Sequence, residues 1–357
     1  MDIFIQKLNF DFVTNQRVLQ LIGHIDGFKG KWNIAEKQEN RYLKELRKIA
    51  TIESIGSSTR IEGATLTDQE VQELLQDIKI TKLKSRDEQE VIGYYEVLEL
   101  TYENYADIKL TESYIKQLHQ LLLKYSHKDE RHRGGYKHLS NKVVATYPTG
   151  EQRTIFATTE PALVAGEMQE LVEWTNENLE QKNIHPLIVI GSFIYDFLSI
   201  HPFQDGNGRL SRLLTTLCLL QNDYSFIQYI SFESHIEQNK KTYYEVLMNG
   251  QKNRGTTKER IDLWLIFFLE SLKTLTEKLE RKYDVFKSKG GYLNDRQTLI
   301  KDFVTNNQPV KVSDVAKQFP EIGLSTLKKD LQYLRKEQVL TMIGKGKGSI
   351  YILNEKD

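Results

Sequence analysis

The sequence has few of the residues on which small, fibrous or membrane proteins depend. Its 357 residues include one cysteine, Cys218, so an intramolecular disulfide framework and a cysteine-rich zinc site are both excluded. With 6 prolines and 21 glycines, it does not resemble a collagen-like or proline-rich disordered chain. No apolar run is long enough to cross a bilayer, and an acid at the second position is not typical of a signal peptide. We therefore expect a soluble, cytoplasmic protein that binds no membrane.

The chain also lacks an excess of charge of either sign. Its 49 Lys and Arg residues balance 49 Asp and Glu residues, so the whole chain has no electrostatic attraction to nucleic acid or to an anionic membrane. Charged residues make up 27% and hydrophobic residues 39%, which is ordinary for a soluble globular protein. The length predicts two or three domains, each able to bury a core.

Apolar residues recur at helical spacing through most of the chain, which predicts a mainly α fold. Thr67 and Glu70 have the spacing of a capping box, and Thr111 is expected to be the N-cap of another helix. Residues 187–200 and 210–220 are apolar nearly all round, as is typical of buried helices. Further helices are predicted over residues 85–105, 111–126 and 259–283 and from Pro161 onward.

Two β-prone runs, 143–147 and 153–157, flank the turn sequence Pro148-Thr149-Gly150 and predict one β-hairpin in a helical protein. After Gly290, the order changes to three short helices (292–306, 313–319 and 325–337) and two strands around residues 344–348. This order is typical of a winged helix, and we expect such a domain at the C-terminus.

The predicted winged helix is basic. Residues 309–353 hold eight basic and four acidic residues, a net charge of +4 by difference. A basic helix and a Gly-Lys-Gly-Lys-Gly wing would suit DNA phosphates. A protein-interaction or dimer module with a solvated basic face is the alternative.

The polar connector between the two buried helices is the most unusual stretch of the sequence. It reads His-Pro-Phe-Gln-Asp-Gly-Asn-Gly-Arg-Leu-Ser-Arg over residues 201–212. Gly206 and Gly208 permit positive φ and let backbone N–H groups gather around an anion. We expect the next helix to begin near Arg209, with its positive end toward the connector and with Arg209 and Arg212 on about one face.

Two further residues of the connector carry reactive groups. Asp205 offers a hard oxygen ligand of the kind that Mg²⁺ takes beside phosphates, and His201 can accept a proton near neutral pH. The combination predicts a site that transfers part of a polyphosphate. It is not a Walker A loop, because no Gly-Lys-Ser/Thr follows. An ordinary turn followed by solvated arginines is the alternative interpretation.

The connector matches the motif His-Pro-Phe-x-Asp-Gly-Asn-Gly-Arg-x-x-Arg of the Fic (fido-fold) family at every fixed position. The resemblance extends over about residues 50–270. Residues 133–136 are similar to the segment before the family's flap, the hairpin 143–157 resembles the flap, and Tyr243-Tyr244 resembles a tyrosine pair on the nucleotide side. The resemblance implies a fido-fold helical core with a β-hairpin flap.

The activity that this resemblance implies is transfer of AMP from MgATP to a Ser, Thr or Tyr hydroxyl of a target protein or of the chain itself. In that reading His201 is the general base, Asp205 holds Mg²⁺, and Phe203 anchors the loop in the core. The flap would bind the target by adding a strand. The resemblance favours a homodimer. The implied ATP-binding residues are Glu62, Thr154, Ile155, Asp205, Gly206, Asn207, Gly208, Arg209, Leu210, Ser211, Arg212, Tyr243 and Tyr244.

Residues 58–63 fit the family's inhibitory pattern Ser/Thr-x-x-x-Glu-Gly/Asn, through Ser58, Glu62 and Gly63. The chain therefore resembles the class whose inhibitory helix precedes the fido core. The resemblance implies that Glu62 pairs with Arg212 and takes the space of the γ-phosphate, and that Glu62 also positions water for the reverse reaction. A solvent-facing helix residue is the alternative for Glu62.

Outside these motifs we expect structural residues. Cys218 and the three tryptophans are predicted to be buried, and His185 to cap the helix that follows it. Four histidines show no metal-binding spacing and are expected at the surface or at boundaries: His119, His127, His132 and His138.

The predicted division of the chain has four parts. These are an N-terminal helical region with the inhibitory motif (1–105), a catalytic core (106–255), a connecting helix (256–290) and the winged helix (291–357). Two whole-protein alternatives to an adenylyltransferase stay open at this point. One is a transcriptional regulator that senses a nucleotide, and the other is a fido enzyme that transfers another phosphate-linked group.

Overall fold

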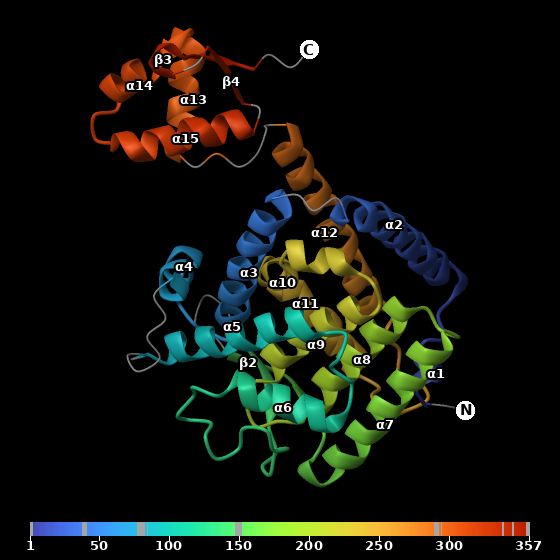
Figure 1. Cartoon of the computed structure of the whole chain (residues 1–357). Coiled ribbons are helices and arrows are strands. Elements are labelled where there is room, and N and C mark those ends of the chain that lie inside the picture. Colours follow the sequence, from blue (N-terminus) through green and yellow to red (C-terminus); the bar gives the residue numbers. More distant parts are fainter. Residues whose placement is uncertain are drawn as a thin grey trace. The chain divides into compact units, whose positions relative to one another are not determined.

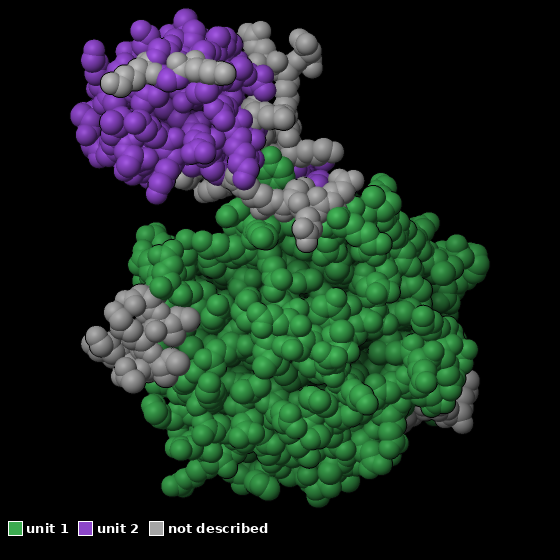
Figure 2. Space-filling model, viewed as in Figure 1, with its two compact units in different colours: residues 1–278 green, residues 279–357 purple. Residues whose placement is uncertain are grey.

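The computed structural model describes residues 3–37, 41–76, 83, 85–146, 152–288, 293, 295–337, 339–344 and 346–354. The mainly α fold is confirmed, with small sheets beside many helices (Figure 1). The chain forms two compact units, residues 1–278 and residues 279–357 (Figure 2). In the described part of the chain, no helix is long and apolar enough to span a bilayer. The four-part division stays a prediction.

The first unit begins with helices whose starts follow from their caps. Thr67 and Glu70 form the predicted capping box, and the Thr111 hydroxyl accepts from the backbone N–H of Tyr114 at 3.2 Å. The helix after Thr111 ends at Leu122, four residues before the predicted end, and the chain then turns through Ser126. These helices are α1 (Ile3–Gln6), α2 (Phe12–Glu36), α3 (Arg41–Ile61), α4 (Asp68–Gln76), α5 (Arg86–Asn104) and α6 (Glu112–Leu122).

The predicted hairpin is present as two antiparallel strands, β1 (Lys142–Thr146) and β2 (Gln152–Ala157). Val143 lies opposite Phe156, and the register shifts by a bulge just after Val143. The turn predicted at Pro148-Thr149-Gly150 lies outside the described residues.

The two apolar segments form the centre of the first unit, as predicted. They are α8 (Pro186–Ile200) and α9 (Asn207–Gln221), and every residue of α8 from Val189 onward is buried. His185 caps α8 as predicted, because its Nδ1 accepts from the backbone N–H of Leu187 at 3.3 Å. α7 (Pro161–Gln181) packs along α8, and α8 packs along α9 (Figure 1).

The remaining elements of this unit follow α9 in the chain, and the last of them, a long helix, packs on α8. Trp264 donates from Nε1 to the Gly191 carbonyl at 2.8 Å, which joins the long helix to α8. The predicted burial of Trp32, Trp174, Trp264 and Cys218 is confirmed. These elements are a 3-10 turn (Ser225–Tyr229), α10 (Phe232–Gln238), α11 (Lys240–Gln251) and α12 (Asp262–Ser288), whose last residues enter the second unit.

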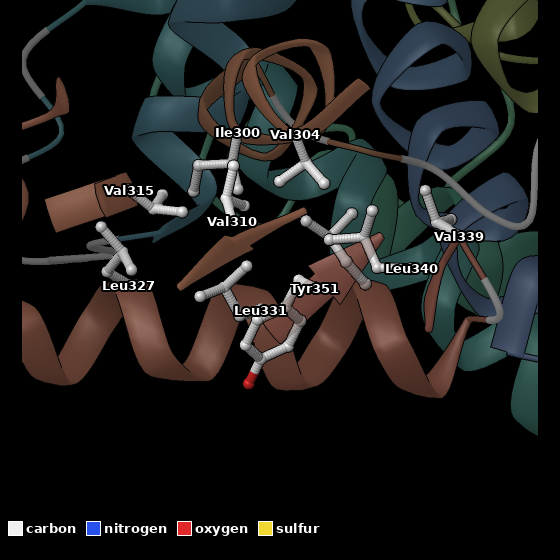
Figure 3. Packing of buried hydrophobic residues seen from close by; sticks show 10 residues of the cluster. Ile300, Val304, Val310, Val315, Leu327, Leu331, Val339, Leu340 and Tyr351 are labelled. Atoms are coloured by element: carbon white, nitrogen blue, oxygen red, sulfur yellow. The ribbon is translucent and has the colours of Figure 1, made fainter. Parts of the chain in front are cut away.

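The second unit contains the predicted three helices and two strands, plus a short strand that the sequence did not predict. The order of its antiparallel sheet is β3-β5-β4. Ile300, Leu327 and Leu331 belong to a core that this unit forms from its own residues (Figure 3). Its assignment as a winged helix stays a prediction. The elements are α13 (Asp295–Asn307), β3 (Val310–Lys311), α14 (Val312–Gln318), α15 (Leu324–Lys336), β4 (Leu340–Ile343), a 3-10 turn (Gly346–Gly348) and β5 (Ile350–Leu353).

Candidate active site

The connector between α8 and α9 is shorter than the sequence predicted. α9 begins at Asn207 rather than near Arg209, because Gly206 takes the N-cap position at φ 80°. A φ of this sign favours glycine, whose missing Cβ removes the steric penalty. The first backbone N–H groups of α9, including that of Gly208, therefore belong to a helix N-terminus, which attracts anions.

Asn207 folds the connector by bonding both backbone groups of Phe203. Its Oδ1 accepts from the Phe203 N–H at 2.9 Å, and its Nδ2 donates to the Phe203 carbonyl at 2.7 Å. Phe203 is buried, so its predicted inward orientation is confirmed. The Asn207 side chain is thus occupied within the loop, and only its backbone can face a ligand.

His119, expected at the surface or at a boundary, is instead 0% exposed and supports the connector from α6. Its ring stacks on Phe203 at a centroid distance of 3.8 Å. Its Nδ1 accepts from the Gly134 N–H at 2.8 Å, and its Nε2 lies 2.9 Å from the Asp205 carbonyl, to which it donates. Burial lowers the pKa of His119 to about 4, so the neutral ring fits both contacts. The surface assignment was wrong because its partners lie 15 and 86 residues away in the chain.

His201 is positioned by the end of α8. It has φ 53° and ψ 60°, and its Nδ1 donates to the Leu198 carbonyl at 3.3 Å, which leaves the Nε2 lone pair available. Burial, followed by the charge of Lys137, lowers the pKa of His201 to about 4. The imidazole is therefore neutral at pH 7 and can accept a proton.

The two arginines of the motif are both buried but differ in their contacts. Arg209 is 1% exposed, lies 3.3 Å from Glu90 Oε2 through Nη1, and has no hydrogen-bond partner at Nε or Nη1 among the described residues. Arg212 donates from Nε to Ser58 Oγ and from Nη2 to the Ser58 carbonyl, both at 2.9 Å. Arg209 thus retains donors for a ligand, whereas Arg212 is held by α3.

The inhibitory motif reaches the same place from α3. Glu62 Oε1 accepts from Arg212 Nη2 at 2.8 Å. A Cβ on Gly208 would collide with Glu62 Oε1, so the carboxylate covers the first turn of α9. Burial favours the neutral acid, but the charges of Arg212 and Arg209 hold the pKa of Glu62 below its ordinary value. Gly63 follows the end of α3 at φ 107°.

Asp205 carries the carboxylate that the sequence assigned to a metal. Its side chain is 28% exposed, and its oxygens lie 3.3 Å from both Lys128 Nζ and Arg209 Nη2. Burial raises the pKa of Asp205, but the Arg209 charge, the Gly206 N–H and Lys128 outweigh it and leave the pKa below its ordinary value. A lone ionised carboxylate fits Mg²⁺, which usually takes one or two carboxylates beside phosphates and water.

The hairpin packs against the tyrosine pair of α11 through Tyr244. Ile155 packs with Val143 on Tyr244 of α11, and Thr154 of the same strand is exposed. Tyr243 is buried and meets Tyr244 edge to face at a centroid distance of 5.2 Å.

Burial raises the pKa of Tyr243, and the nearby Arg212 charge opposes that shift. Leu210 and Ser211 are buried within α9, and the Ser211 hydroxyl donates to the Gly208 carbonyl at 2.8 Å. The roles of all these residues in binding ATP stay predictions.

Comparison with known proteins confirms the resemblance to the Fic family. The sequence model of the family described as "Fic/DOC family" matches residues 109–219 of this chain. The curated "Protein adenylyltransferase Fic" of Drosophila willistoni is 30% identical over 191 residues, which are 52% of this chain and 35% of that protein. The protein of the same name from Drosophila grimshawi is 31% identical over 192 residues, which are 52% of this chain and 36% of that protein. The chain thus spans little more than a third of the length of these relatives.

Solved structures show the same fold. A Fic family protein from Desulfovibrio desulfuricans G20 has a TM-score of 0.63 at 23% identity and covers 96% of this chain and 97% of its own. Fic-1 (aa134 - 508) from C. elegans has a TM-score of 0.55 at 20% identity, and the match covers 77% of this chain and 73% of that chain.

Proposed function

We propose, from the premise that residues 109–219 belong to the Fic/DOC family, that this chain transfers AMP from ATP to a hydroxyl group of a protein. The observation that supports this best is a neutral His201 close to the N-terminus of α9. Its Nε2, and Nε and Nη1 of Arg209, have no hydrogen-bond partner among the described residues. A proton acceptor next to an anion site suits phosphoryl-type transfer, in which positioning and fixed charges supply most of the catalysis. The names of the curated relatives, protein adenylyltransferases, support the same activity.

In the proposed reaction, His201 Nε2 takes the proton of a Ser, Thr or Tyr hydroxyl. The hydroxyl oxygen forms a bond to the α-phosphorus of ATP, the bond from that phosphorus to the bridging oxygen breaks, and pyrophosphate leaves. The backbone N–H groups of Asn207 and Gly208 and the Arg209 guanidinium bind phosphate oxygens, whereas the Gly206 N–H already donates to Asp205 Oδ1. Mg²⁺, held by Asp205, would offset phosphate charge.

We also propose that α3 inhibits this reaction. Glu62 covers the first turn of α9, and with Ser58 it occupies Arg212, so a carboxylate stands where a phosphate anion would bind. Removing Glu62 removes the repulsion and the carboxylate contact of Arg212, whereas the contacts of Arg212 with Ser58 remain. The reverse reaction, with Glu62 positioning water, belongs to the same proposal.

Self-labelling with α-³²P-ATP tests both proposals. Glu62→Gly is expected to raise incorporation at least about tenfold, because tenfold corresponds to only about 1.4 kcal/mol of transition-state stabilisation. His201→Ala in the Glu62→Gly chain should abolish incorporation while ATP affinity stays nearly the same. The matched control is Glu45→Gly, which removes an exposed acid from the same helix.

Two outcomes would contradict these proposals. Equal labelling of the wild-type and Glu62→Gly chains would show that α3 does not inhibit the reaction. Retained transfer in the His201→Ala chain would show that His201 is not the general base. Labelled UTP or γ-labelled ATP, tested in parallel, distinguishes transfer of UMP or phosphate from transfer of AMP.

A second function, DNA binding, is favoured by the exposed face of α15. Its exposed residues from Lys328 onward are basic or neutral, and its one acid, Asp330, is buried and paired with Arg296. Such a cationic face suits the phosphates of a DNA duplex. These exposed residues are Lys328, Lys329, Gln332, Arg335 and Lys336.

A mobility shift with a random duplex at about 50 mM and 200 mM salt tests this function, since phosphate contacts weaken steeply with salt. Lys329→Glu should weaken binding, whereas the control Lys317→Glu, an exposed lysine of α14, should weaken it less. Absence of a shift at both salt concentrations would favour a protein partner.

Two further expectations stay predictions. One is that the flap binds the target by adding a strand, and the other is that the chain forms a homodimer.

A further inference from the structure

One buried lysine, Lys137, binds the backbone on both sides of His201. Its own N–H donates to the Pro202 carbonyl at 2.8 Å, and its Nζ donates to the Ile200 carbonyl at 3.1 Å. His201 between them is in the left-handed region at φ 53°. That conformation costs a non-glycine residue about 1–2 kcal/mol, so bonds to its neighbours help to hold it.

The same ammonium also binds both ends of the flap. Nζ donates to Asn141 Oδ1 at 2.9 Å and to Thr158 Oγ1 at 2.7 Å. Asn141 directly precedes β1, and Thr158 directly follows β2. The three acceptors match the three donors of an ammonium group, and Lys137 is 2% exposed.

Stability alone does not account for a buried ammonium group. Burial lowers the pKa of Lys137 to about 8, with the Glu160 and Glu167 charges opposing the shift and the Arg254 charge adding to it. A depressed lysine pKa means that the folded chain holds this charge at a cost. Its contacts join the two ends of the flap to the backbone on each side of His201, so they point to a role in geometry.

We propose that Lys137 is a positioning residue that ties both ends of the flap to the backbone on each side of His201. A target strand added to the flap is thereby held at one fixed place relative to the imidazole. The consequence for catalysis rests on the proposed function, whereas the link between flap and His201 does not.

Hydrogen exchange of the full chain at pH 7, followed by mass spectrometry, tests the link. In Lys137→Met, the amides of residues 142–146 and 152–157 are expected to exchange about tenfold faster, the effect of losing one charged hydrogen bond. Exchange in α8 and α9 should stay the same. The thermal midpoint is expected to fall, because Asn141 Oδ1, Thr158 Oγ1 and the Ile200 carbonyl lose their donor. Lys137→Arg, which keeps the charge and donors, should restore most of the protection.

The control variant is Lys142→Met, which removes an exposed lysine of β1. A second readout is the NMR titration of the His201 imidazole, assigned by comparison with His201→Ala. The charged groups that act on His201 are Lys137, Glu62 and Asp205, so loss of the Lys137 cation should raise its pKa.

Unchanged flap exchange in Lys137→Met, or a rise shared by all of residues 3–278, would overturn the proposal. An unchanged His201 titration would overturn it as well. None of these measurements requires AMP transfer, so the proposed function can fail while this inference holds.

Discussion

At the scale of single residues, the site depends on side chains that the sequence motif does not contain. His119 holds the Asp205 carbonyl and the Gly134 N–H in their positions, and Lys137 holds the backbone around His201. Neither residue has a neighbour in the sequence that reveals its role. A short helix carrying one histidine looks like many other surface helices, and only the partners distinguish it.

His119→Phe is expected to destabilise the first unit by about 2–6 kcal/mol at pH 7. The new ring can still stack on Phe203, but the Gly134 N–H and the Asp205 carbonyl lose their partners, at about 1–3 kcal/mol for each buried group. Urea unfolding measures the change, and His138→Phe, at an exposed position, is the control.

The difference between wild type and His119→Phe should shrink in acid. Because the folded pKa of His119 is depressed from 6.5 to about 4, the unfolded chain takes up the proton first as the pH falls. Its stabilising effect is complete above pH 6.5 and is lost progressively toward pH 4, by about 3 kcal/mol. A difference that stays constant between pH 7 and pH 4.5 would contradict the neutral buried ring.

At the scale of elements, the close approach of α8 to α12 sets the position in space of the C-terminal end of α8. Gly191 faces α12, where a Cβ would lie 2.8 Å from Leu265 Cδ1 and 3.1 Å from Phe268 Cδ1. The absence of a side chain allows the two helices to touch, and Trp264 then bonds the Gly191 carbonyl. The position of His201, ten residues further along, follows from this contact because a helix is stiff over that length.

Gly191→Ala and Gly166→Ala form a matched pair of helical substitutions. Gly191→Ala is expected to lower the free energy of unfolding by about 1–3 kcal/mol, since the added methyl group has no room. An added Cβ at Gly166 of α7 would have no neighbour within 4 Å. Gly166→Ala should therefore raise the free energy of unfolding by up to about 1 kcal/mol. Thermal unfolding of both chains checks the opposite signs, and shifts of the same sign would contradict the packing argument.

At the scale of the whole molecule, two compact units each bury their own apolar residues. The ligand-binding residues proposed for AMP transfer all lie within residues 1–278, and the basic face of α15 lies within residues 279–357. A change in the core of the second unit should therefore leave chemistry in the first unit unaffected.

Leu331→Ala tests this separation. Leu331 is 0% exposed, and its truncation is expected to destabilise the second unit by about 2–5 kcal/mol. Calorimetry of the full chain should show one transition moved to lower temperature and another unchanged, while self-labelling of the Glu62→Gly chain stays the same. Gln332→Ala, at the exposed neighbour, is the control. A single transition that shifts as a whole would argue against independent units.

Much of the fold could be predicted because its signals are local. The capping box at Thr67, the N-cap at Thr111, the hairpin and the two buried helices all follow from residues within a few positions of one another. The start of α9 was placed too late, since the positive φ of Gly206 makes it an N-cap without any side-chain signal. The strand β3 was missed because two residues carry too little pattern.

The sequence by itself determined which residues compose the motif 201–212, since their order and spacing form one short stretch. The pairing of Glu62 with Arg212 was expected from the family resemblance, whereas the tertiary structure decided the other contacts of the motif. Packing brings Ser58 and Glu62 from α3 onto the Arg212 side chain, His119 from α6 onto the Asp205 carbonyl, and Lys137 onto the Ile200 carbonyl. Contacts between residues 63 to 154 positions apart depend on how whole helices pack, and no local pattern encodes that.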